Sequence, residues 1–109
     1  MPATFEEKLV WAIALFLNVP AGAVNVRDIY KPFEDEDVIS AYGSVDLNWL
    51  QVLWNANFNS EGTGSIQFQL VPFETIKIEN ANDFNGDEGI WEFEMENWEI
   101  SPIYARYGV

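Results

Sequence analysis

From residue 45 onward, hydrophobic and polar side chains alternate in one segment after another, and this period of two constrains the fold more than any other feature. The alternation runs through 45–58, 66–70, 73–79 and 90–96. Because neighbouring side chains of a strand point to opposite faces, it predicts antiparallel strands with one face buried and one in water. Residues 45–58 are expected to form two strands, or one long strand with a change of register near Leu50.

Shorter alternating segments and turn residues complete the pattern. Residues 23–30 predict a strand that is broken at Asp28, and residues 38–42 predict another that turns at Gly43-Ser44. The stretch 59–64, Asn-Ser-Glu-Gly-Thr-Gly, is a turn by composition.

The last third of the chain contains two irregularities. Pro72 indicates an edge, a bulge or a bend, because proline cannot donate to a sheet ladder. Within 90–100 the alternation changes parity at Asn97-Trp98, which is typical of a β-bulge that would return Trp98 to the core. Without a bulge, Trp98 would lie among the glutamates. Residues 102–107 form an aromatic tail, and 80–89 a polar loop.

The N-terminal segment has a different period. Its apolar residues recur at spacings of three and four, namely Phe5, Leu9, Ala12, Ile13 and Phe16. Thr4 and Glu7 have the spacing of a capping box, and Asn18 with Pro20 marks an end, so a helix is predicted over 4–17. Glu6 and Glu7 outweigh Lys8 ahead of the apolar run, which argues against an export signal and favours the cytoplasm.

This helix carries a second apolar stripe, formed by Trp11, Ala14 and Leu15. A helix that is apolar almost all round is buried on both sides or contacts another chain. A sheet that curls around the helix is the preferred explanation. The alternative is an oligomer or partner contact through Trp11 and Leu15.

Together these patterns predict a single α+β domain over residues 1–109, with the N-terminal helix packed on a curved antiparallel sheet of five or six strands. Glutamates in 90–100 are expected to protect an edge of that open sheet by like-charge repulsion.

Charge limits the partners. Eighteen Asp and Glu face five Lys and Arg, giving a net charge of −13. Nucleic acid and anionic membranes are therefore not expected partners, whereas a basic protein surface or a cation is. The alternative is that the acidity only confers solubility or suits a salty habitat.

The chain has neither histidine nor cysteine. Ser-His-Asp and Cys-His catalysis and His- or Cys-ligated zinc are thereby excluded. No catalytic or cofactor motif stands out among the remaining residues, so we expect a non-enzymatic protein without a cofactor.

The acids concentrate in two segments. The first is the run Glu34, Asp35, Glu36 and Asp37; the second holds seven of the eighteen acids, namely Asp83, Asp87, Glu88, Glu92, Glu94, Glu96 and Glu99. Glu92, Glu94 and Glu96 share one strand face at intervals of about 6–7 Å, and such a row could imitate a phosphate backbone. We take both segments as candidate partner-binding residues. The simpler alternative is a solvated loop and a solvated sheet face.

A calcium loop is a weaker hypothesis. Asp83, Asn85, Asp87 and Glu94 match ligand positions of an EF-hand, but Glu88 stands where that loop requires glycine. The flanking segments also predict strands rather than helices.

The leading expectation is a small acidic protein that binds a basic partner surface, as inhibitors, immunity proteins and nucleic-acid mimics do. The alternative is a structural subunit of a larger assembly, such as a virus or phage particle. A calcium-dependent module is the third.

Overall fold

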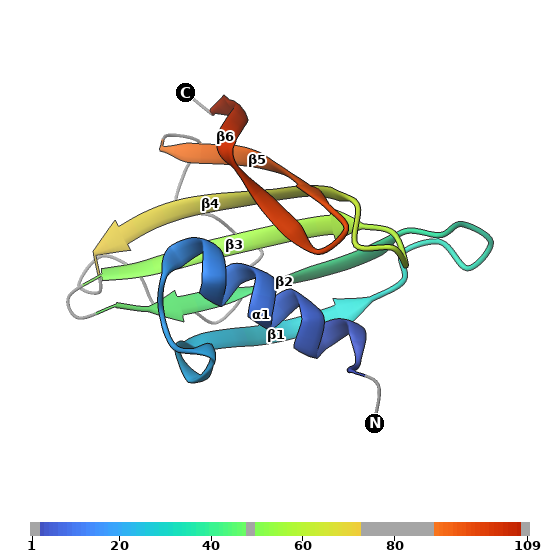
Figure 1. Cartoon of the computed structure of the whole chain (residues 1–109), viewed down its shortest axis with the longest axis horizontal. Helices are drawn as coiled ribbons and strands as arrows, with labels where there is room; N and C mark the ends of the chain where they lie inside the picture. The colour runs from blue at the N-terminus through green and yellow to red at the C-terminus, as the bar shows by residue number, and fades with distance from the viewer. Residues whose placement is uncertain (1–2, 48–49, 73–88, 108–109) are drawn as a thin grey trace.

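The protein, in a computed structural model that describes residues 3–47, 50–72 and 89–107, has one helix packed on a six-stranded sheet (Figure 1). The elements are α1 (Phe5–Leu17), a 3₁₀ turn (Ala21–Ala23), β1 (Val24–Tyr30), β2 (Ile39–Asp46), β3 (Leu50–Phe58), β4 (Gly64–Pro72), β5 (Ile90–Glu96) and β6 (Glu99–Tyr107). Every strand pairs antiparallel with the next, in the order β1-β2-β3-β4-β5-β6, and the sheet is not closed. The predicted α+β class is confirmed.

Helix α1 begins and ends where the sequence predicts. The backbone N–H of Glu7 donates to Thr4 Oγ1 at 3.1 Å, and the N–H of Thr4 donates to Glu7 Oε1 at 3.1 Å, which completes the capping box. Asn18 ends the helix in the left-handed conformation, with φ 57°.

The core lies between α1 and the face of the sheet that turns toward it. Leu9 and Ile13 of the helix are fully buried, as are Trp54 and Ile66 of the central strands. The helix contacts β1 and β6, the two edge strands, so the sheet curls around it.

The curled sheet nevertheless does not cover the second stripe of the helix. Ala14 is buried, but 53% of Trp11 and 79% of Leu15 are exposed. The preferred explanation of this stripe is therefore wrong for Trp11 and Leu15, which point away from the sheet into solvent.

The predicted turn at Gly43-Ser44 is also wrong, because β2 continues through it. A Cβ at Gly43 would meet the backbone oxygen of Asn25 and lie 2.8 Å from the Trp54 ring. Glycine is needed here for close packing, beside the bulge between Val26 and Asp28 that matches the predicted break in β1.

Residues 45–58 belong to two strands, as one alternative predicted, and the chain leaves β2 at Asp46 and enters β3 at Leu50.

Asn97 and Trp98 form a two-residue hairpin turn between β5 and β6 rather than a bulge. Both have positive φ, 52° and 64°, as a type I′ turn requires. The prediction of a bulge missed this because Trp is a rare residue at such a position. Because β6 follows, β5 is an internal strand, and its glutamates do not protect an edge.

The remaining predictions in this region have mixed outcomes. The turn over 59–64 is confirmed, except that Gly64 already begins β4, and Pro72 is the last residue of that strand. The aromatic tail 102–107 belongs to β6. The predicted strand 73–79, and the loop 80–89 apart from Gly89, lie outside the described residues. Among the described residues, no helix has the length and hydropathy needed to cross a membrane.

Candidate functional site

Three connections meet at one end of the sheet, on the right in Figure 1: the β1–β2 loop, the β3–β4 turn and the β5–β6 turn. The β3–β4 turn joins the other two. Ser60 donates to Asp37 through its backbone N–H at 3.0 Å and its hydroxyl at 2.8 Å. On its other side, the backbone N–H of Asn97 donates to Thr63 Oγ1 at 3.2 Å.

This junction brings the acidic run 34–37 to the same end of the molecule as Glu94, Glu96 and Glu99, the exposed acids of the second segment within the described residues. We define the acidic end as the exposed acids Glu34, Asp35, Glu36, Asp37, Glu61, Glu94, Glu96 and Glu99. Sequence reasoning placed the run 34–37 and the glutamates of β5 separately, and it missed Glu61. The signal for their proximity was the antiparallel order of the strands, which puts every second connection at the same end of the sheet.

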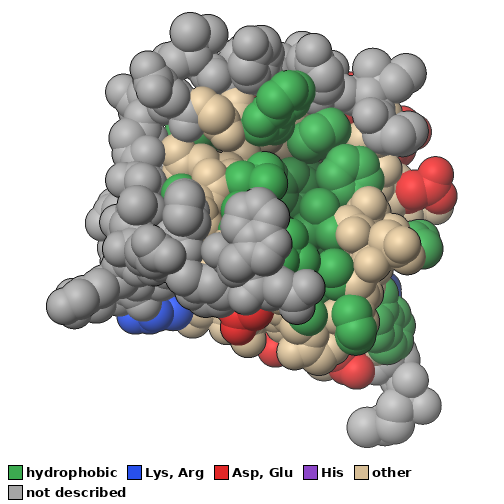
Figure 2. Space-filling view, turned by 90° about the vertical axis from the view of Figure 1, so that its left-hand side faces the viewer, with side chains coloured by type: hydrophobic (Ala, Val, Ile, Leu, Met, Phe, Trp, Pro, Cys, Tyr) green, Lys and Arg blue, Asp and Glu red, His purple; other side chains and the backbone are tan. Residues whose placement is uncertain are grey.

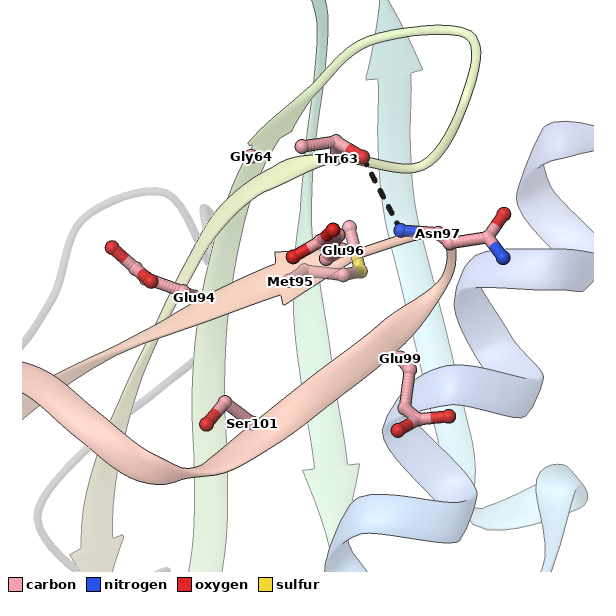
Figure 3. Close-up of a pocket in the computed structure, with 8 residues that line it drawn as sticks. All are labelled: Thr63, Gly64, Glu94, Met95, Glu96, Asn97, Glu99 and Ser101. Atoms are coloured by element: carbon pink, nitrogen blue, oxygen red, sulfur yellow. Dashed lines mark hydrogen bonds between the residues drawn. The ribbon is translucent and has the colours of Figure 1, made fainter.

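The β5–β6 hairpin and the β3–β4 turn enclose an open hollow of about 670 Å³. Figure 3 shows its lining, in which Glu94 and Glu96 come from β5 and Glu99 from β6. Glu96 and Glu99 are direct cross-strand partners, and like charges in that position destabilise a hairpin. The three carboxylates point in different directions in Figure 3, an arrangement that suits separate cationic groups better than one metal ion.

Glu92 differs from the other glutamates of β5. It is half-buried, and Gln67 Nε2 donates to its Oε1 at 2.8 Å. The predicted row of three carboxylates is therefore reduced to two exposed ones on β5, with Glu99 of β6 beside them.

The calcium hypothesis stays a prediction. Asp83, Asn85 and Asp87 lie outside the described residues, as does Glu88. Within the described part of the chain, no group of three or more acidic side chains is arranged to hold a metal ion.

Trp98 packs the β5–β6 turn against helix α1, strand β3 and the β3–β4 turn. Its ring stacks on Phe5 at 5.9 Å and meets Phe58 edge-on at 5.3 Å, while its backbone N–H donates to the Gly62 oxygen at 3.0 Å. Lys8 Nζ lies 5.6 Å from the centroid of the same ring, within cation–π range. The sequence left the side of Trp98 undecided; the ring packs toward the helix and the core.

The face of the sheet away from α1 carries a neutral polar hollow that the sequence analysis missed. Tyr30, Ser40, Tyr42, Asn55, Asn57 and Gln67 line it. Ser40 Oγ donates to Asn57 Oδ1 at 2.6 Å, and Gln67 is bonded to Glu92. These bonds join neighbouring strands and account for Ser40, Asn57 and Gln67 without a ligand.

The opposite end of the molecule has a different surface. Figure 2 views it from the left of Figure 1, where hydrophobic side chains occupy the middle of the described surface and Asp and Glu lie toward its edges.

Comparison with protein-family models, with curated proteins and with solved structures finds no match for this chain.

Proposed function

We propose that this protein works by contact rather than catalysis, and that its acidic end binds a basic surface of a partner protein. One observation carries the proposal: the acidic run 34–37 and the glutamates at 94–99, more than fifty residues apart in sequence, lie at one end of the sheet, where hydrogen bonds join both of their segments to the β3–β4 turn. Inhibitors, immunity proteins and nucleic-acid mimics use charge in this way, to raise the rate of association and to select the partner.

The energetic cost of the arrangement also supports a role in binding. Glu96 and Glu99 are cross-strand partners beside a tight turn, where a solvated hairpin would gain stability from opposite charges. A basic partner would relieve this repulsion, because its lysines and arginines would lie between the two carboxylates.

Binding of a short labelled lysine peptide tests the proposal. Its affinity for the protein is expected to fall steeply as salt rises. Glu36→Lys, in the acidic end, is expected to weaken binding more than Asp46→Lys, which changes the net charge equally. Asp46 lies at the far end of β2, about 23 Å away along the strand. Equal effects of the two substitutions, or affinity that does not change with salt, would contradict the proposal.

Exposed Trp11 and Leu15 favour a second candidate, a structural subunit of a larger assembly. Light scattering at high protein concentration separates the two candidates. A closed ring or a fibre would support the assembly, and a strict monomer would count against it.

A further inference from the structure

An apolar groove of about 310 Å³ lies between the outer face of α1 and the β5–β6 turn. Lys8, Trp11, Ala12, Leu15 and Trp98 line it, and almost all of its surface is carbon. Trp11 and Leu15 are four residues apart, so they form one stripe of the helix. Large side chains with such high exposure contribute little to folding, but they are typical anchors of protein interfaces.

The floor of the groove is fixed before any partner arrives. Trp98 is packed between Phe5 and Phe58, and its indole covers Gly62, where no Cβ would fit. The groove therefore need not be ordered on binding, and this lowers the entropic cost of association.

The charges around the groove select its occupant. Glu7 lies one helical turn before Trp11, and Glu99 directly follows Trp98; both are exposed. Among the described residues that line the groove, Lys8 is the only cation, and it lies over the Trp98 ring. A second copy of the chain would itself carry a net charge of −13 and would be repelled, whereas a basic segment would complement the acidic rim.

We infer that the groove binds a basic amphipathic helix of the partner, whose apolar stripe packs on Trp11 and Leu15 while its lysines or arginines meet Glu7 and Glu99. The inference rests on the proposed function and adds the anchor to it. The acidic end would set the rate of association, and the groove would set the lifetime of the complex.

A synthetic amphipathic helix of leucine and lysine, about five turns long, serves as the probe in fluorescence anisotropy. Leu15→Ser is expected to weaken its binding about 10-fold, and Trp11→Ala about 30-fold. The matched control is Leu70→Ser, because Leu70 is 54% exposed but lies on β4, outside the groove. This variant is expected to bind the synthetic helix with the wild-type affinity. A peptide of the same composition in scrambled order, without an apolar face, is expected to bind more weakly.

Three results would overturn the inference. If Leu15→Ser bound the synthetic helix as tightly as the wild type while Glu36→Lys still weakened binding, the groove would not be a contact surface, but the acidic end would remain one. If neither Leu15→Ser nor Glu36→Lys weakened binding, the proposed function would be contradicted as well. A concentration-dependent dimer that Leu15→Ser abolishes would show that a second copy occupies the groove.

Discussion

Gly62→Ala tests how the acidic end is held together. Gly62 has φ +77°, and a Cβ at this position would overlap the indole of Trp98. An alanine would therefore carry two penalties, one from its backbone conformation and one from the ring that it displaces. Trp98 cannot shift freely, because it also packs against Phe5 and Phe58.

The two penalties can be sized separately. A left-handed conformation costs a residue with a side chain about 1–2 kcal/mol. Forcing one extra methyl group into packed surroundings costs about 1–3 kcal/mol. The free energy of unfolding is therefore expected to fall by about 2–5 kcal/mol, which lowers the melting temperature by roughly 8–20 °C in a domain of this size.

Two other glycines provide the controls. Gly89 also has positive φ, +71°, but none of the described residues lies within 4 Å of the added Cβ, so Gly89→Ala isolates the backbone penalty. Gly22 has neither strain nor close neighbours, and Gly22→Ala is expected to be neutral or slightly stabilising. Urea denaturation followed by circular dichroism gives the three free energies. If Gly62→Ala costs no more than Gly89→Ala, the packing of Trp98 on Gly62 is refuted.

Three further substitutions test other parts of the account by thermal melting. Thr4→Ala removes the capping box and is expected to lower the free energy of unfolding by about 1 kcal/mol; an unchanged melting temperature would contradict a stabilising role of the cap. Glu99→Lys pairs opposite charges across the turn and is expected to raise the melting temperature by about 1–4 °C at low salt, less at high salt; a fall would refute the repulsion with Glu96. Trp98→Ala is expected to cost about 2–3 kcal/mol, whereas exposed Trp11→Ala leaves stability almost unchanged; similar losses would contradict the different packing of the two rings.

The sequence predicted those parts of the fold that local physics decides. The capping box at Thr4, the break in the strand at Asp28 and the alternation of the strands all follow from residues close together in sequence. The errors arose where tertiary contacts override a local preference. Gly43 lies inside a strand because Asn25 and Trp54 crowd it. Trp98 stands at a turn position where glycine is the usual residue, and it is held there because its ring is packed on three sides.

The candidate site could be predicted only in part. The acidic residues were evident, and an antiparallel strand order places their connections at one end of the sheet, but no spacing in the sequence reveals the hydrogen bonds that join the loops, such as Ser60 to Asp37. The exposure of Trp11 was equally hidden, since an apolar helix face can turn toward a sheet or toward solvent.

Titration of the isotope-labelled protein with a short lysine peptide, followed by NMR, tests the central claim most directly. Changes in the backbone chemical shifts are expected to concentrate in residues 33–38, 59–64 and 94–99, the segments that carry the acidic end, and to disappear at high salt. Shifts distributed evenly over the sheet, with Asp46 affected as strongly as Glu36, would contradict a contact surface and leave the acidity as a general coat.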